Sequence, residues 1–278
     1  MLCCLAGAAA APAQSPQNIV VTSASSFQVG FPARGSIGAI FCTGLNVTGT
    51  VQADGVPLPW SLAGVSVTVG GGNAPLFSVS ALNGYQQINF QVPQEAVFAL
   101  DGSATITVTQ NGNTGTGTGK LQIYLITPWS PGDFFMLPNS SYGAFQHADF
   151  ALITTTNPAK AGETVIGYLT GLPGTEPVVP TGQASPYSPL AVVPQTPFGS
   201  GERYVDEYSI LAPTGKASVT FLGLAPGLVG VYQVNFVLPS STPSGDLSVL
   251  LERHQCSDGC LFGSYSFTDS KSVLLPVR

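Results

Sequence analysis

Charged side chains are scarce in this chain of 278 residues. It has 8 Lys and Arg against 14 Asp and Glu, so charged residues make up 8% and the net charge is −6. No basic stripe is present to neutralise phosphates, which excludes nucleic acid as the partner. Hydrophobic residues make up 44%, which excludes disorder of the low-hydrophobicity, high-charge kind. The surface must therefore be covered by uncharged polar residues and glycine, as in secreted all-β proteins.

Long apolar runs are also missing, since no stretch reaches the roughly 18 apolar residues of a membrane-spanning helix. We therefore expect no membrane span. The short apolar run of residues 2–11 is followed by Ala11-Pro12-Ala13, which has the small-x-small pattern of a signal-peptide cleavage site. We interpret residues 1–13 as the remnant of a signal peptide and Gln14 as the mature start. The protein is then expected to be secreted or held at the cell surface.

Cysteine is rare, and beyond the signal segment only three remain. Cys256 and Cys260 flank the turn dipeptide Asp258-Gly259, which predicts a local disulfide in an oxidising compartment. A zinc site would need four ligands, and His254 is the only further candidate nearby, so no metal is expected. Cys42 lies in an alternating apolar run and is interpreted as a small buried hydrophobic residue.

One strand pattern occurs twice. Residues 85–93 read Tyr-Gln-Gln-Ile-Asn-Phe-Gln-Val-Pro, and residues 232–239 read Tyr-Gln-Val-Asn-Phe-Val-Leu-Pro. Alternating apolar side chains predict a strand with one face in a core and Gln and Asn on the other face. The terminal proline ends each strand. The residues expected in the core are Ile88, Phe90, Val234 and Phe236.

A second motif repeats in the same order, which indicates two domains. Thr43-Gly44-Leu45 returns as Thr170-Gly171-Leu172. The offset is 127 residues between Thr43 and Thr170 and 146 between Gln87 and Gln233, so the second copy holds 19 additional residues. This insertion falls in the proline-rich segment 173–207. The chain length suits two domains of ordinary size.

Short alternating runs separated by turn residues are typical of a β-sandwich. In one example, the apolar residues Ala104, Ile106 and Val108 alternate with threonines. Asn111-Gly112 then predicts a hairpin turn, and Leu121, Ile123 and Leu125 form the expected return strand. A Pro- and Gly-rich stretch follows, whose aromatic residues we expect between the domains. The expected organisation is a signal remnant (1–13), a first sandwich (14–127), a connecting seam and arm (128–160) and a second sandwich (161–278) with the 173–207 insertion.

Four motifs together carry a family resemblance. They are residues 157–163 (Asn-Pro-Ala-Lys-Ala-Gly-Glu), Thr164 to Gly171, Leu222 to Pro226 and the two Gln-x-Asn-Phe strands. The chain resembles an uncharacterised paralogous domain at the C-termini of many secreted acidobacterial proteins, whose repeats are similar to IPT/TIG-type immunoglobulin-like domains. The resemblance covers essentially the whole mature chain and implies two tandem immunoglobulin-like antiparallel β-sandwiches exported from a bacterium. It implies no catalytic or binding residues, because the family has no established activity.

Two clusters of titratable residues are candidates for a catalytic or metal-binding role. His147 and Asp149 would share one face of a strand, as an acid–base or metal pair does, but a role in a turn or edge strand is favoured because no second His-rich element exists. Glu202, Asp206 and Glu207 form the one acidic cluster. Adjacent residues of a strand point to opposite faces, which argues against a glycosidase pair, and calcium is the alternative. No Gly-x-Ser-x-Gly elbow supports a catalytic triad.

The 173–207 insertion is either a binding loop or a packed surface excursion, and we expect it to be the site of recognition. Its prolines restrict the unfolded chain and lower the entropy lost on holding one loop shape, and function usually sits in loops. We expect that shortening it would leave stability nearly intact. Trp60 and Trp129 each stand in Pro-Trp-Ser, and either stack on sugar rings or plug the core or seam. The residues expected to bind are Tyr187, Phe198, Glu202, Tyr204, Asp206, Glu207, Trp60 and Trp129.

These observations favour a non-enzymatic bacterial module without a cofactor, serving adhesion, display or extracellular structure. Its partner is expected to be an extracellular protein or a glycan. An accessory carbohydrate-binding protein is the alternative reading. A glycoside-acting enzyme that uses Asp206 and Glu207 is the remoter one.

Overall fold

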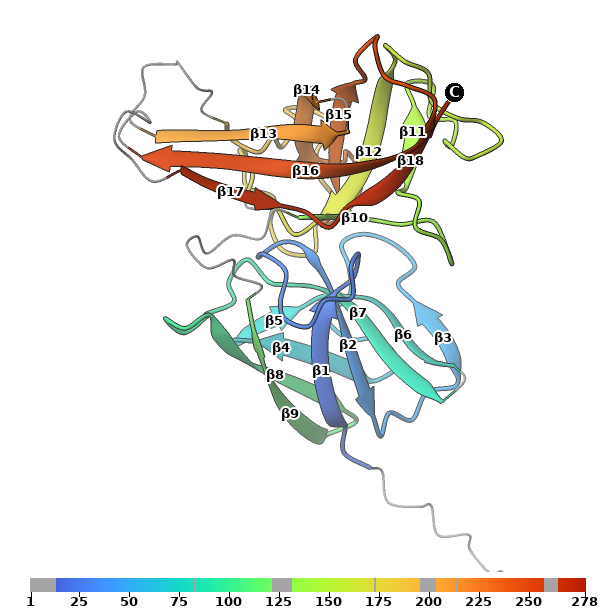
Figure 1. Ribbon diagram of the computed structural model, residues 1–278. Coiled ribbons are helices and arrows are strands. Elements are labelled where there is room, and N and C mark those ends of the chain that lie inside the picture. The colour runs from blue at the N-terminus through green and yellow to red at the C-terminus, as the bar shows by residue number, and fades with distance from the viewer. Residues whose placement is uncertain are drawn as a thin grey trace, which may run out of the picture.

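The computed structural model describes residues 14–82, 84–121, 132–172, 174–195, 204–213, 215–257 and 265–278. The elements in these ranges are β-strands, and the named strands pair with one another antiparallel. Figure 1 shows two stacked bodies, β1 to β9 below and β10 to β18 above. The predicted all-β fold is confirmed. No helix in the described ranges is long and apolar enough to span a bilayer.

The first body is an immunoglobulin-like sandwich. Its sheets have the orders β1-β2-β7-β6-β3 and β5-β4-β8-β9. In chain order these are the A-B-E-D and C′-C-F-G layers of an immunoglobulin domain, with β3 as an additional edge strand. The strands are β1 (Gln17–Ser23), β2 (Ile37–Thr43), β3 (Gly49–Gln52), β4 (Val65–Val69), β5 (Gly72–Ala74), β6 (Leu76–Leu82), β7 (Tyr85–Gln91), β8 (Ser103–Gln110) and β9 (Asn113–Lys120).

The second body repeats the central part of this plan, because β12, β15 and β14 pair as β2, β7 and β6 do. In addition β13 pairs with both β14 and β16. The strands of the second body are therefore connected into one sheet of nine. The strands are β10 (Asp133–Phe134), β11 (Phe145–His147), β12 (Thr164–Thr170), β13 (Tyr204–Ala212), β14 (Gly215–Leu224), β15 (Tyr232–Val237), β16 (Gly245–Ser257), β17 (Tyr265–Asp269) and β18 (Val273–Val277).

The stretch expected to be a connecting arm contributes to the second sheet. β10 and β11 both pair with β12. Phe134, expected between the domains, instead lies in the second core, where its ring centroid is 5.1 Å from that of Phe145. Phe145 in turn meets Phe236 edge to face at 6.1 Å. An extended segment ahead of β12 therefore takes the place that β1 holds beside β2.

The repeated strand lies at the centre of each sheet. β7 runs between β2 and β6, and β15 runs between β12 and β14. Ile88 and Phe90 are fully buried in the first core, and Val234 and Phe236 are fully buried in the second. The predicted register of both strands is confirmed.

The return strand of the β8–β9 hairpin differs from the prediction. Asn111 and Gly112 have φ of 48° and 86°, as the expected tight turn requires. The strand that follows is the Thr-Gly repeat of β9, which ends before Leu121. Its inward positions are glycines because β1 packs directly over them: a Cβ at Gly117 would lie 2.9 Å from Ile19 Cγ2.

Cys42 is buried in β2, as expected for a small hydrophobic residue. Burial disfavours the thiolate and raises the pKa of Cys42 to about 11. The predicted Cys256–Cys260 disulfide lies outside the described residues, since Cys260 and the side chain of Cys256 are not described, and it stays a prediction.

Replacing Phe90 or Phe236 by Ala should lower the free energy of unfolding by roughly 3–5 kcal/mol, because each change removes buried apolar surface and leaves a cavity. Chemical denaturation measures this loss. The exposed Thr105→Ala variant is the control and should stay within about 0.5 kcal/mol of the parent. A loss below about 1 kcal/mol at both phenylalanines would contradict the described cores.

Cys42 should react slowly with iodoacetamide at pH 8, because its raised pKa leaves about a hundredfold less thiolate than an ordinary thiol with a pKa of 9.0. Denaturant should restore the rate. The linked stability is full below pH 9 and is lost as the pH rises from about 9 to about 11, since the unfolded thiol ionises first. Labelling at equal rates in native and unfolded protein would contradict this.

Candidate functional site

The structure describes part of the expected binding set. Trp129, Phe198 and Glu202 lie outside the described residues. For Tyr204 and Asp206 only the backbone is described, on β13 where it pairs with β16. The acidic cluster therefore stays a prediction.

Three members are described with their side chains, and they lie apart. Trp60 is 50% exposed on the loop that follows β3. Glu207 is half-buried on β13, opposite His254 of β16. Tyr187 is 78% exposed and lines a hollow beside β12, β14 and β15. Of the three, only Tyr187 stands in a cluster of aromatic side chains.

The described part of the insertion, residues 174–195, is packed rather than free. Val192 forms a bridge with Gly223 of β14, so the segment runs along the edge that β3 takes beside β6 in the first repeat. Val179 and Ala191 are buried in the second core. The insertion thus completes the sheet edge and leaves Tyr187 on its outer side.

The insertion also binds the first repeat. Thr181 Oγ1 donates a hydrogen bond to Glu95 Oε2 at 2.8 Å. The backbone N–H of Gly182 donates to Gln91 Oε1 at 2.6 Å, and its carbonyl accepts from the N–H of Leu58 at 2.8 Å. Our expectation that the insertion could be shortened without loss of stability is therefore corrected, because these contacts hold the domains together.

The Thr-Gly-Leu motif of the second repeat also contacts the first repeat, and we call this interface between the two sandwiches the seam. Thr170 Oγ1 accepts a hydrogen bond from the N–H of Ile37 and donates to the carbonyl of Gly230, both at 2.9 Å. The N–H of Gly171 donates to Ser36 Oγ at 3.0 Å. Thr170 and Ser36 are fully buried. Bonds shielded from water in this way fix the orientation of the two sandwiches.

Tyr187 helps to line a groove of about 460 Å³ on the outer face of β12, β15 and β14. The groove is lined by aromatic rings, aliphatic side chains and two amides, without a charged side chain. Phe150 is 64% exposed there. Ligand sites have this character, an apolar lining with a few placed polar groups. The members that define what we call the aromatic–amide groove are Phe150, Tyr168, Tyr187, Phe221, Gln233 and Asn235.

The polar groups of the groove are ordered by one another. Gln233 Nε2 donates to Asn235 Oδ1 at 2.9 Å, and Tyr168 OH donates to Gln146 Oε1 at 2.8 Å. Burial raises the pKa of Tyr168, so the hydroxyl stays protonated at neutral pH. Each carboxamide has two donor hydrogens and two lone pairs. The pair can therefore bond to each other and still offer hydrogen bonds to a ligand.

The first repeat carries the same outer-face pattern. Gln87 Nε2 donates to Asn89 Oδ1 at 2.7 Å, as the second amide pair does. Phe41 lies opposite Gln87 in the ladder, where Tyr168 lies opposite Gln233. These side chains lie on the outer face, so packing between the two layers of a sandwich does not require them.

One further aromatic position recurs, and a β-bulge brings a phenylalanine near the Asn of each repeat. The bulge lies opposite the Asn in both repeats, but Phe77 is the extra residue of the first bulge, whereas Phe221 is paired with Asn235. Phe27 follows the turn after β1, and Phe150 follows the turn after β11. Both have the left-handed conformation, with φ of 55° and 66°. This conformation costs a bulky residue about 1–2 kcal/mol and marks functional sites when it is retained.

The sequence alone missed most of this cluster. The repeated Gln-x-Asn was visible, but it was interpreted only as the polar face of a strand. The one signal that could have identified it is that the polar face repeats as faithfully as the apolar face. Phe27 and Phe150 carried no such signal, because their turns differ in length and sequence.

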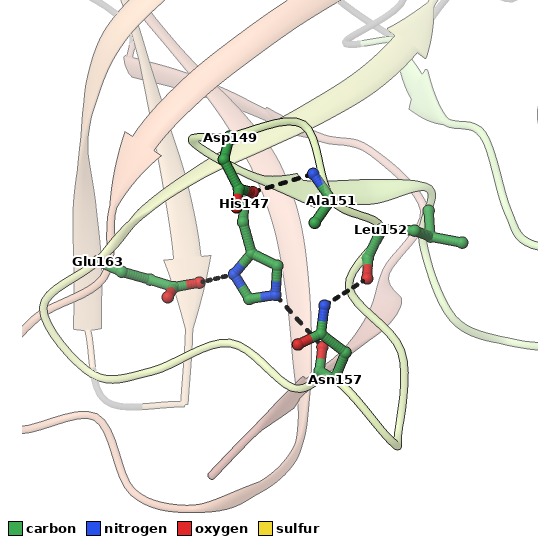
Figure 2. Close-up of polar contacts among 6 residues, drawn as sticks. All are labelled: His147, Asp149, Ala151, Leu152, Asn157 and Glu163. Atoms are coloured by element: carbon green, nitrogen blue, oxygen red, sulfur yellow. Dashed lines mark hydrogen bonds and ion pairs between the residues drawn. The ribbon is translucent and has the colours of Figure 1, made fainter.

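His147 and Asp149 line a separate hollow of about 480 Å³, and Figure 2 shows its polar contacts. His147 Nδ1 lies 3.0 Å from Glu163 Oε1, and its Nε2 lies 3.4 Å from the carbonyl oxygen of Asn157. Asp149 Oδ1 accepts from the N–H of Ala151 at 3.0 Å. The interpretation of His147 and Asp149 as edge-strand and turn residues is confirmed. In the described ranges no three His, Cys, Asp or Glu residues gather as a metal site would require.

No protein-family model matches the chain, and no curated protein matches it. Among solved structures it is similar to a chimeric titin Z1Z2 that carries a decorin peptide, with 12% identity over 96% of this chain and 98% of that chain and a TM-score of 0.17. It is also similar to Rst D1-D2, with 9% identity over 95% and 100% and a TM-score of 0.20. These TM-scores are too low to support a fold assignment, so the immunoglobulin-like assignment rests on the strand order.

Thr170→Val should lower the free energy of unfolding by about 1–3 kcal/mol, because it leaves the buried N–H of Ile37 and the carbonyl of Gly230 without a partner. Denaturation measures the loss, and small-angle scattering should show a looser arrangement of the domains. The matched control is Thr43→Val, the same motif position in the first repeat, where the side chain is exposed. Equal effects at the two positions would contradict the seam described above.

Proposed function

We propose that the protein is a non-enzymatic, secreted or cell-surface module for adhesion or display, and that its ligand surface is the aromatic–amide groove. The observation that carries this proposal is the recurrence of one outer-face pattern in both repeats. Core positions recur because each sandwich must pack, whereas the half-buried aromatics and amides of the outer face are not needed for packing between the layers. Their recurrence is explained if the face binds a ligand.

The chemistry of the groove supports binding rather than catalysis. Hydrolysis of a glycoside needs two positioned carboxyl groups, and acyl transfer needs a nucleophile beside a base. The titratable side chains among the residues lining the groove are the hydroxyls of Tyr168 and Tyr187. Neither is adjacent to a base among those residues, whereas exposed aromatic rings provide contact area at low entropic cost.

An extracellular location is supported by the interpreted signal segment 1–13, by the low content of charge and by the resemblance to exported bacterial domains. The hydrogen bonds between the two sandwiches support a display role, because they hold the sandwiches in one orientation. An accessory carbohydrate-binding protein is the second candidate. The uncharged lining of the groove favours it.

The test is retention of residues 14–278 on a panel of immobilised extracellular polymers, made up of neutral and acidic polysaccharides and fibrous matrix proteins. The native protein should be retained on at least one polymer. The double variant Phe150→Ala with Tyr187→Ala should lose at least tenfold in affinity, because it removes the two most exposed rings of the groove. Leu100→Ala, an exposed apolar residue that does not line the groove, is the control and should bind as the parent does.

Thermal unfolding of each variant shows that it is folded. Retention on none of the polymers would overturn the proposal, and so would a double variant that binds as tightly as the parent.

A further inference from the structure

We infer that the ligand is an uncharged, extended polysaccharide, and that it lies along a track from the aromatic–amide groove across the seam onto the first repeat. This inference rests on the proposed function and names its ligand. Three features of the structure carry it: the chemistry of the groove, the continuity of two hollows and the fixed seam.

The chemistry of the groove matches a sugar ring. Such a ring has an apolar C–H face, which packs on an aromatic side chain, and an edge of hydroxyls, which pair with planar amides. Tyr187 and Phe150 provide exposed aromatic surface, and Gln233 and Asn235 provide the amides. No side chain lining the groove is charged, and the net charge of −6 disfavours polyanions. A neutral glycan fits both facts.

The groove continues onto the first repeat. A second hollow of about 550 Å³ is lined by residues of both domains, among them Phe77 and Asn89 of the first and Leu228 of the second. Leu228 also lines the aromatic–amide groove, so the two hollows meet at this half-exposed side chain. We call the second one the seam hollow. Its Asn89 corresponds to Asn235 of the groove, and Phe77 adds an aromatic ring beside it, so the seam hollow provides a second subsite next to the groove.

The seam keeps this path aligned. The buried hydrogen bonds of Thr170, Gly171 and Gly182 hold the first repeat against the second before any ligand arrives. A chain long enough to reach both subsites then binds without the cost of ordering two domains. Its second contact is intramolecular and adds to the affinity of the first. Affinity should therefore rise with chain length.

A proline-rich peptide is the competing occupant, because aromatic-lined grooves also bind polyproline helices. The seam hollow favours the glycan. Asn89, Ser78 and Gln52 line it together with a single carboxylate, Asp54, and such groups match a ligand that carries a hydroxyl on every unit.

The experiment measures affinity for oligosaccharide ladders from the disaccharide to the octasaccharide, in neutral cello-, xylo- and chito-series, by titration calorimetry. Polygalacturonate and a polyproline peptide serve as the charged and the peptide comparisons. In the series that binds, affinity should rise at least tenfold from the shortest to the longest member. Tyr187→Ala should weaken every length at least tenfold.

A variant in the first repeat distinguishes a ligand that spans both repeats from one that binds only in the aromatic–amide groove. Phe77→Ala should weaken the longest oligosaccharides several-fold and leave the shortest unchanged. Asn89→Ala provides a second test should Phe77→Ala unfold, as its thermal midpoint would show. Leu100→Ala, which lines neither hollow, should leave every affinity unchanged.

The outcomes distinguish the two proposals. Binding of the polyproline peptide or of a matrix protein, without any neutral glycan, would overturn this inference and leave the proposed function standing. An affinity that does not depend on chain length, or that neither first-repeat variant alters, would overturn the track. The absence of binding to every polymer would overturn both.

Discussion

The structure depends on the two-sided character of one strand. In β7 and β15 the period-two alternation of a strand sends apolar side chains into a core and the Gln and Asn of the repeat to the other side. A shift of one residue would exchange the two faces. The same constraint that buries Phe90 and Phe236 therefore also places the amide pairs on the outer surface, so the cores and the candidate site cannot be separated from each other.

The two repeats use the same residues for different tasks. Thr43 and Thr170 occupy the same motif position, yet the first is exposed and the second is buried between the domains. The insertion has a comparable double role, since Val192 completes the edge of β14 while Gly182 bonds to the first repeat. The two sandwiches are thus joined through residues of the second repeat, namely Thr170 at the end of β12 and Gly182 in the insertion.

The sequence predicted those features that an alternating apolar pattern encodes locally. It did not predict features that depend on contacts between segments far apart in the chain. Strand register, two domains and the buried Cys42 followed from local patterns. β9 did not, because its inward side chains are absent where β1 lies against it, so no apolar alternation marks the strand. Tyr187 was recognised in the insertion, but its neighbours come from β12, β14, β15 and a turn, which no local pattern brings together.

The position of the seam also has a mechanical meaning. Figure 1 shows that β1 starts at the end of the first sandwich remote from the seam, and that β18 ends in the second sandwich. Tension applied between Gln17 and Val277 loads the contacts of Thr170 and Gly182, which join the two sandwiches alongside the covalent chain. These hydrogen bonds are few compared with the strand ladders of either sandwich, so the contact between the sandwiches is the mechanically weaker part of the molecule.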